Sequence, residues 1–403
     1  MTSWLASAQD SPFGLHNLPY GVFSTAGEPG RRRIGVAVGD SVLDAGAAAR
    51  AAGEPSVLLD ADTLDPLLAA GRPAWTDVRA SLTRWLSEES YREALSPHLY
   101  PADEVTLHLP FTVGDYVDFY ASERHATNLG KIFRPGTEPL TPNWKHLPIG
   151  YHGRSGSVVV SGTDVARPHG QRKAPTEELP SFGPSRRLDI EAEVAFVVGA
   201  GSELGKPVPQ EDFREHVFGV CLLNDWSSRD IQAWEYVPLG PFLGKSFATS
   251  LSPWVVPLDA LEAARVQPPA REFELLPYLA DREDEPWGLD ISLTVRLNGQ
   301  EISRPPFAGM YWTAAQMLAH MTVNGASVRP GDLFASGTVS GAEPDTRGAL
   351  IELTWNGQEP VKLDDGTTRS YLEDGDTVTI SATAPGPDGT VISFGEVTGR
   401  IVP

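Results

Sequence analysis

A run of alternating acidic and apolar residues is the first feature of the sequence that could do chemistry. Residues 188–196 read Leu-Asp-Ile-Glu-Ala-Glu-Val-Ala-Phe, and a period of two is typical of a half-buried strand. Glu191 and Glu193 would then point to the same side of the strand, roughly 6 to 7 Å apart at Cα. Two carboxylates on one face repel each other unless a cation or water lies between them. Taken alone, the segment favours a solvated acidic face over a metal site.

Two further acids strengthen the case for a metal site. Asp118 is flanked by aromatic residues, and Asp225 follows the apolar run 217–223, so both are predicted to lie in partly buried places. An ionised carboxylate is unfavourable there unless it is paired or bound to a metal. Oxygen ligands suit Ca²⁺ or Mg²⁺, whereas zinc would require His or Cys at short spacing, and the nine histidines contain no HExxH pattern.

A loop that contains a lysine imitates a phosphate-binding motif. Residues 240–246 are similar to a P-loop, but the spacing is one residue short and no clean strand-to-helix context surrounds them. Nucleotide binding is therefore not predicted. Lys245 still stands out, because the prolines and glycines of residues 237–247 predict a rigid loop rather than a solvated helix face.

The charge balance and the cysteine content exclude several classes of protein. With 53 acidic residues against 32 basic ones, the formal net charge is −21, and no run of five basic residues offers a surface for nucleic acid. The single cysteine, Cys221, lies in an apolar run and is predicted to be a buried, unreactive thiol. The N-terminus has no signal-peptide pattern, and no apolar stretch approaches the ~20 residues that span a bilayer. The sequence therefore predicts a cytoplasmic protein without a membrane partner.

The elements that must position these side chains fall into two parts. Residues 31–44 have the composition of a small hairpin, and residues 62–70 and 80–95 are predicted helices. A proline-rich segment, 96–110, then favours a domain boundary at about residue 110. We predict an N-terminal domain, 1–110, and a C-terminal domain, 111–403.

The C-terminal domain is predicted to be mostly strand and turn. Five Asn-Gly or Asp-Gly dipeptides, which begin at residues 298, 356, 365, 374 and 388, favour tight hairpins and hence a β-rich roll or sandwich. The clearest helix covers 310–322. Residues 350–355 alternate like a strand, on which Glu352 would be exposed, and His125 taken alone is predicted to be a surface histidine.

Seven motifs follow one another along nearly the whole chain. They are 17–24 (NLPYGVFS), 114–120 (GDYVDFY), 125–128 (HATN), 147–154 (LPIGYHGR), 224–232 (NDWSSRDIQ), 234–246 (WEYVPLGPFLGKS) and 329–338 (RPGDLFASGT). In this order they resemble the fumarylacetoacetase family. The two aromatic-rich motifs separate that family from the wider superfamily of hydratases, decarboxylases and acylpyruvases, which mostly share only the carboxylate core.

The resemblance implies a mainly β fold of the α+β class. It implies an N-terminal SH3-like β-barrel joined to a C-terminal mixed β-sandwich roll, and a homodimer of such chains. It also implies a Ca²⁺ or Mg²⁺ ion held by Asp118, Glu191, Glu193 and Asp225. Lys245 and Thr249 are associated with the cation in the family, although an ammonium group cannot ligate a cation. For Lys245 we therefore expect only the backbone carbonyl or a neighbouring role.

The resemblance further implies a hydrolase acting on carbon–carbon bonds in ketonic substances. Its substrates would be 4-fumarylacetoacetate and water, and its products fumarate and acetoacetate, at the end of tyrosine and phenylalanine degradation. Such a reaction requires an activated water, a stabilised oxyanion and an electron sink for the departing enolate. By resemblance, His125 is the base and Glu352 its partner. Arg229, Gln232 and Lys245 are the donors, and the metal is the Lewis acid.

The substrate pocket and the alternatives complete the prediction. By resemblance the pocket is lined by Tyr120, Arg134, Tyr151, Gln232, Tyr236 and Thr338, with the fork of donors of Arg134 suited to a substrate carboxylate.

The alternative enzyme is an acylpyruvate or other β-diketone hydrolase or decarboxylase with the same core. A non-catalytic, metal-stabilised dimerising module is the alternative from another class, and the presence of both His125 and Glu352 disfavours it.

Overall fold

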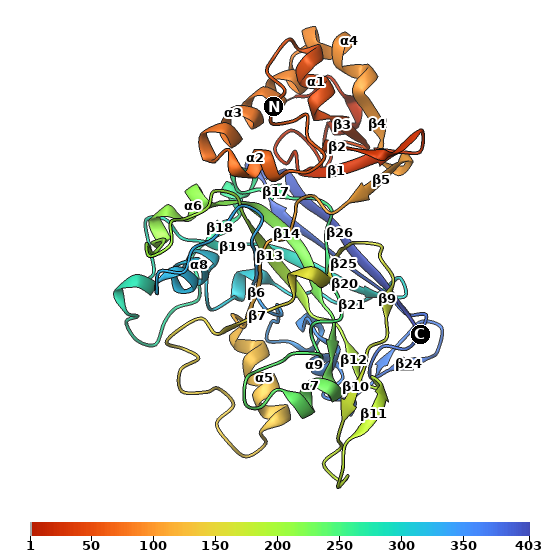
Figure 1. Ribbon diagram of the computed structural model, residues 1–403, viewed down its shortest axis with the longest axis vertical. Coiled ribbons are helices and arrows are strands. Elements are labelled where there is room, and N and C mark those ends of the chain that lie inside the picture. Colours follow the sequence, from red (N-terminus) through yellow and green to blue (C-terminus); the bar gives the residue numbers. More distant parts are fainter. Residues whose placement is uncertain (1) are drawn as a thin grey trace.

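A computed structural model describes residues 2–403, and it consists of a small N-terminal part at one end of the longest axis and a larger β-rich part below it (Figure 1). The N-terminal part contains a five-stranded antiparallel sheet in the order β4-β3-β2-β1-β5. Its strands are β1 (Tyr20–Thr25), β2 (Glu28–Val38), β3 (Ser41–Asp44), β4 (Leu99–Pro101) and β5 (Val105–His108). The predicted hairpin is confirmed as β2 and β3, and Gly39 supplies the positive φ of 61° that its turn requires.

The helices of the N-terminal part differ from the prediction in their bounds. They are α1 (Ala45–Ala51), α2 (Asp65–Ala69), α3 (Arg72–Ser87) and α4 (Arg92–Leu95). The predicted helix 80–95 is wrong as one element, because α3 begins at Arg72 with a proline in its first turn and ends at Ser87. A 3₁₀ turn over Glu89–Tyr91 then redirects the chain into α4.

The larger part is built around an eight-stranded mixed sheet. The path β7-β6-β22-β13-β14-β16-β8 is hydrogen-bonded throughout, and β17 pairs with β14. The pairs β6–β22 and β8–β16 are parallel, and the others are antiparallel. The strands are β6 (Tyr116–Phe119), β7 (Gly150–His152), β8 (Val158–Val160), β13 (Ala192–Val198), β14 (Val217–Asp225), β16 (Thr249–Leu251), β17 (Val256–Pro257) and β22 (Leu333–Ala335).

A second sheet of five strands packs against the first, in the order β21-β20-β25-β26-β9. It consists of β9 (Val165–Ala166), β20 (Ser292–Leu297), β21 (Gln300–Ser303), β25 (Thr377–Pro385) and β26 (Val391–Val402). Four two-stranded pairs complete the strands: β10 (His169–Arg172) with β11 (Ser181–Pro184), β12 (Leu188–Asp189) with β15 (Ser227–Ser228), β18 (Arg265–Val266) with β19 (Gly288–Leu289), and β23 (Val361–Lys362) with β24 (Thr368–Arg369). Three of the five predicted Gly turns, at 298, 365 and 388, join directly paired strands.

The eight-stranded sheet is buried on both faces, which places its polar residues in the interior. On β13, Val194 and Phe196 belong to the core shared with the second sheet, where they join residues such as Ile380. Ala195 and Val197 point the other way, into a core shared with the N-terminal part. Glu191 and Glu193 have the same parity as this second set, and they are buried. The predicted solvated acidic face is therefore wrong, because the N-terminal part packs on this face at Ala195 and Val197, and Arg229 and Lys245 bond to Glu191 farther along it.

The helices of the larger part are short and lie outside the sheets. They are α5 (Glu123–Phe133), α6 (Phe213–His216), α7 (Arg229–Glu235), α8 (Ala314–Thr322) and α9 (Leu350–Leu353). The predicted helix 310–322 begins instead at Ala314, because Thr313 and Gln316 form a capping box there. The predicted strand 350–355 is wrong, since the chain forms α9 and then turns through Trp355 and Asn356 at positive φ. No helix among residues 2–403 has the length and apolar character required to cross a membrane.

Candidate active site

Four carboxylates converge at the eight-stranded sheet. Asp118 lies on β6, Glu193 on β13 and Asp225 at the end of β14, while Glu191 lies between β12 and β13. All four are buried, and one oxygen of each lies within 4.8 Å of the others. The segment 188–196 is thus not one regular strand, because residues 190 and 191 separate β12 from β13, yet Glu191 and Glu193 both reach the cluster.

The cluster meets the requirements of a cation site. Among the described residues, Asp118 Oδ1 and both oxygens of Glu193 have no hydrogen-bond partner although they are buried. Burial, together with the neighbouring carboxylates, raises the pKa of Asp118 and of Glu193 well above the ordinary values. Unpartnered buried carboxylate oxygens are unfavourable unless a positive charge meets them. Hard oxygen donors at this spacing fit a divalent cation, and this acidic cluster could hold one.

Lys245 supplies a positive charge at one edge of the cluster. Its Nζ donates to Glu191 and, at 2.7 Å, to Asp225 Oδ2. Asp225 also accepts from Thr249 Oγ1 at 3.1 Å and from the Tyr151 hydroxyl at 2.8 Å. Burial opposes the charge of the ammonium group, but Asp225 and Glu191 outweigh it and raise the pKa of Lys245. The side chain of Lys245 is therefore an ion-pair partner of the ligand set rather than a member of it.

His125 and Glu352 form a buried dyad next to the cluster. His125 lies in the first turn of α5, which Ser122 caps by accepting a hydrogen bond from the His125 backbone N–H at 3.2 Å. Its Nδ1 lies 2.6 Å from Glu352 Oε2, and its Nε2 lies 3.6 Å from Glu191 Oε1. The predicted surface positions of His125 and Glu352 are both wrong, because 2% of His125 is exposed and none of Glu352.

The environment of the dyad controls its charge. Burial by itself would lower the pKa of His125, but the charge of Glu352 and the contacts with Glu191 outweigh burial and raise the pKa to about 9. Glu352 also accepts from Asn128 Nδ2 at 2.9 Å and from Ser340 Oγ at 2.8 Å. Burial opposes the charge of Glu352, yet His125 and these donors hold its pKa below the ordinary value. The carboxylate is thus ionised, and in the neutral form of His125 it keeps the ring proton on Nδ1.

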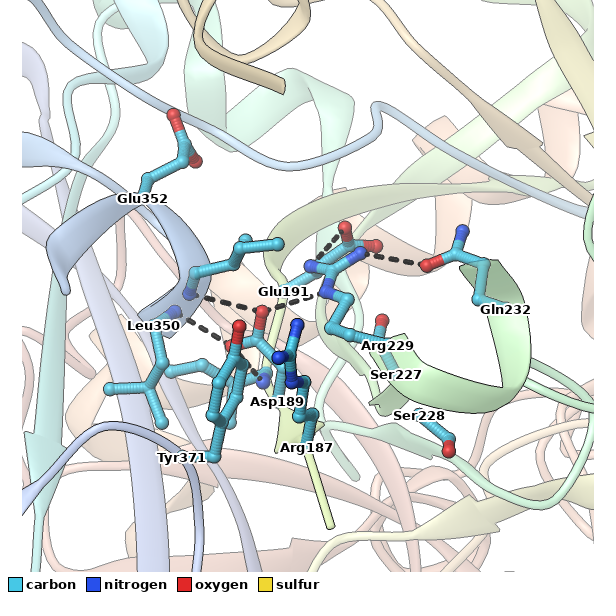
Figure 2. A network of polar contacts seen from close by, with 12 residues as sticks. Arg187, Asp189, Glu191, Ser227, Ser228, Arg229, Gln232, Leu350, Glu352 and Tyr371 are labelled. Carbon is cyan, nitrogen blue, oxygen red and sulfur yellow. Dashed lines mark hydrogen bonds and ion pairs between the residues drawn. The ribbon is translucent and has the colours of Figure 1, made fainter. Parts of the chain in front are cut away.

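Arg229 lies at the start of α7, and its guanidinium points toward Asp189, Glu191 and Gln232 (Figure 2). Nε donates to Asp189 at 2.8 Å, Nη2 to Glu191 at 2.8 Å and Nη1 to Gln232 at 3.2 Å. A guanidinium carries five N–H donors, so two donors remain after these three bonds. Because Arg229 lines the cavity described next, those two N–H groups are available to a bound molecule.

A cavity of about 450 Å³ joins the dyad, Arg229 and the cluster. Every residue predicted for the substrate pocket lines it, namely Tyr120, Arg134, Tyr151, Gln232, Tyr236 and Thr338. His125, Arg229, Lys245, Asp118 and Glu191 line it as well. Glu193, Asp225, Thr249 and Glu352 lie behind these residues and do not reach its wall. Apolar side chains for which the sequence predicted no role also line the cavity, among them Leu129, Phe133, Ile149 and Leu239.

Three residues in contact with the site were not predicted. Asn128 lies three positions after His125 on α5, and this helical spacing could have indicated their shared face. Asp189 continues the alternating pattern of Glu191, so its type and position were also available. Nothing in the sequence around Ser340 distinguishes it from an ordinary loop serine.

Comparisons with known proteins give a consistent result. The family model described as Fumarylacetoacetase N-terminal matches residues 16–110, and the one described as Fumarylacetoacetate (FAA) hydrolase C-terminal matches residues 116–402. The fumarylacetoacetase of Homo sapiens is 48% identical over 417 residues, covering 100% of this chain and 99% of the human protein. That of Arabidopsis thaliana is 47% identical over 418 residues, with the same coverage. A solved fumarylacetoacetate hydrolase from Exiguobacterium antarcticum shares the fold, with a TM-score of 0.56 at 17% identity, over 96% of this chain and 99% of that one.

Proposed function

The chain belongs to the fumarylacetoacetase family and hydrolyses 4-fumarylacetoacetate to fumarate and acetoacetate (EC 3.7.1.2), and we propose that the dyad, Arg229 and the acidic cluster carry out this reaction. The observation that carries the proposal is the position of His125, which joins Glu352 on one side and the cavity on the other. The alternative, a hydrolase or decarboxylase for another β-diketone or an acylpyruvate, is not favoured by relatives that match over the full chain.

The proposed first step is activation of water by His125. Nδ1 is bound to Glu352, and the 3.6 Å between Nε2 and Glu191 is too long for a hydrogen bond. Nε2 is therefore the nitrogen that can take a proton from a water molecule in the cavity. Glu352 stabilises the imidazolium that results, in the way that an oriented carboxylate supports a histidine base.

Stabilisation of the new negative charge falls to the fixed donors. Arg229 and Gln232 line the cavity and are bonded to each other, so these donors need little reorganisation when an oxyanion forms. Lys245 adds a buried positive charge beside them. Arg134 and the tyrosine hydroxyls of the lining are proposed to hold the substrate, with Arg134 placed to pair with a carboxylate.

We propose that Asp118, Glu191, Glu193 and Asp225 hold Ca²⁺ or Mg²⁺, with Thr249 supporting Asp225. When bound, such an ion supplies Lewis-acid stabilisation for the enolate that leaves. With the charge of Glu191 offset by a cation, the pKa of His125 would be lower, which would favour the neutral base. Titration of the protein with each metal, followed by calorimetry, measures which of the two ions binds more tightly.

Four further proposals rest on the sequence and the family resemblance. We place the domain boundary near residue 110, where the first family match ends, and we propose that the N-terminal part is of the SH3-like barrel type. A homodimer and a role at the end of tyrosine and phenylalanine degradation also follow from the resemblance. The cytoplasmic location stays a prediction.

A panel of diketo acids tests the proposed function. The reaction is followed by the loss of fumarylacetoacetate absorbance, with short acylpyruvates as competing substrates. We expect the largest kcat/KM for fumarylacetoacetate. A larger value for an acylpyruvate would contradict the assignment.

A further inference from the structure

We infer that Asp189 is a positioning residue that links Arg229 to the helix carrying Glu352. Neither the sequence motifs nor the pocket assigns a role to this residue. Asp189 is fully buried, does not line the cavity, and lies on β12 opposite Ser227 of β15. The inference rests on the roles proposed above for Arg229 and Glu352.

The Asp189 carboxylate accepts four hydrogen bonds, all from N–H groups (Figure 2). Oδ1 accepts from the backbone N–H of Ile190 and of Leu350, both at 2.7 Å. Oδ2 accepts from the backbone N–H of Ile351 at 3.1 Å and from Arg229 Nε at 2.8 Å. Each of these partners can only donate, so the position requires a group that accepts on both oxygens.

Helix α9 depends on Asp189 for its start. The first N–H groups of a helix lack partners within it, and they usually bond to the side chain of the residue before the helix. That residue is Ala349 in α9, and it has no side chain able to accept. Asp189 accepts from the first two amides of α9 in its place. Glu352 is the third residue of this helix, so the same contacts set the position of its carboxylate.

Arg229 is tied to the same strand through both its backbone and its side chain. Its backbone N–H donates to the Arg187 carbonyl at 2.9 Å, and its Nε donates to Asp189. With Nε held, the plane of the guanidinium is fixed, and its two outer nitrogens point to Gln232 and Glu191. The Asp189 carboxylate thus sets the orientation of the Arg229 guanidinium and of Glu352, the partner of His125. A misplacement of about 1 Å in such groups can reduce the rate about 100-fold.

Substitution Asp189→Asn tests this link. An amide has one accepting oxygen, so its NH₂ must face two of the four N–H donors. In either orientation one of the first two amides of α9 loses its acceptor, and in one orientation Arg229 Nε loses its acceptor as well. We expect kcat to fall about 100-fold while KM changes less than about threefold, because the donors act mainly in the transition state. Hydrogen exchange at the amides of Leu350 and Ile351 should become faster, which a purely local effect at Arg229 would not produce.

Asp376→Asn is the matched control. Asp376 is also buried, and it accepts from the Arg369 guanidinium, from Asn298 Nδ2 and from a backbone amide. It lies immediately before β25 and does not line the cavity. This variant should lose stability while its kcat stays within about twofold of the wild type, since it reproduces the loss of a buried ion pair without touching the site.

The double variant Asp189→Asn with Glu352→Gln separates positioning from a general loss of stability. Residues that act as a unit give non-multiplicative effects, so the loss in the double variant should be smaller than the product of the single losses. Unchanged kcat in Glu352→Gln and Arg229→Lys would contradict the proposal that the dyad and Arg229 carry out the reaction. Losses in those two variants with an Asp189→Asn kcat within threefold would overturn only the inference about Asp189. If Asp189→Asn and Asp189→Ser are both insoluble while Asp376→Asn is soluble, Asp189 serves folding and the inference is also overturned.

Discussion

Removal of the charge of Glu352 is the sharpest test of the dyad. In Glu352→Gln the side-chain oxygen can still accept from His125 Nδ1 and Ser340 Oγ, and the new NH₂ can donate to Asn128 once that amide turns over. The substitution therefore keeps the shape and the hydrogen bonds of a fully buried group. It removes only the negative charge that stabilises the imidazolium.

The expected loss follows from the geometry. Nδ1 and Oε2 are 2.6 Å apart, and the centres of the two delocalised charges lie farther apart, at about 4 Å. At that separation and an effective dielectric constant of about 20, the attraction amounts to about 4 kcal/mol. Since about 1.4 kcal/mol corresponds to a tenfold change in rate, kcat should fall about 10³-fold.

The pH dependence gives a second, independent readout. His125 must be neutral to act as a base, and the charge of Glu352 contributes to raising its pKa to about 9. Without that charge the pKa falls, so the acidic limb of the rate profile should move to lower pH. The full loss in kcat should therefore appear on the alkaline side of the wild-type pKa, and the difference should narrow as the pH falls.

The assay follows fumarylacetoacetate absorbance under saturating substrate and metal. Glu54→Gln is the control, because Glu54 also accepts from three side chains, those of Ser81, Arg84 and Trp85, but lies in the N-terminal part. Its kcat should match the wild type. A Glu352→Gln kcat within tenfold of the wild type, or a ratio that is the same at every pH, would refute the dyad.

Three other outcomes are expected. His125→Ala should remove turnover but leave calorimetric Ca²⁺ binding largely intact, and near-normal kcat would contradict its role as the base. Chelation of divalent metal should abolish activity reversibly and lower Tm, because binding to the native state alone stabilises it; an unchanged rate and Tm would refute a resident cation. For Asp376, burial alone would raise the pKa, but the bonds from Arg369 and Asn298 hold it below its ordinary value. Asp376→Asn should therefore lower the free energy of unfolding by about 2 kcal/mol at neutral pH. This difference should shrink below about pH 4, as the wild-type carboxyl takes up its proton, and urea titrations with an equal difference at both pH values would contradict the assignment.

Local patterns in the sequence predicted the composition of the site better than its surroundings. The alternation of residues 188–196 correctly placed Glu191 and Glu193 on one side of the sheet. It could not reveal that this side is covered, because the cover comes from distant segments: the N-terminal part packs on Ala195 and Val197, and the partners of Glu191 lie 38 and 54 positions after it. The prediction of an exposed Glu352 on a strand is wrong for a related reason. Its helix starts with amides that bond to Asp189, so a contact across 161 positions decides between helix and strand.

The resemblance to a family identified the residues that line the cavity, yet it left out those that hold them. Asn128 and Ser340 bond to Glu352, and Asp189 bonds to Arg229, but none of the three faces the cavity. Motifs that recur with a reaction point to groups near the substrate. Supporting groups become visible only when the distances between atoms are known.

The dyad has a consequence for the synthesis of the protein. His125 and Glu352 are 227 positions apart, and at roughly 5 to 20 residues per second a ribosome needs about 10 to 45 s to add that length. Asp118 is made before His125, and the other three acids of the cluster are made in the first half of this interval, so a growing chain carries their uncompensated charge well before it carries a functional base. Strands β25 and β26, which close the core, follow Glu352. Translation that stops before α9 would thus release a chain with the complete acidic cluster, half of the dyad and an open core, which makes premature termination a route to aggregation rather than to a partially active enzyme.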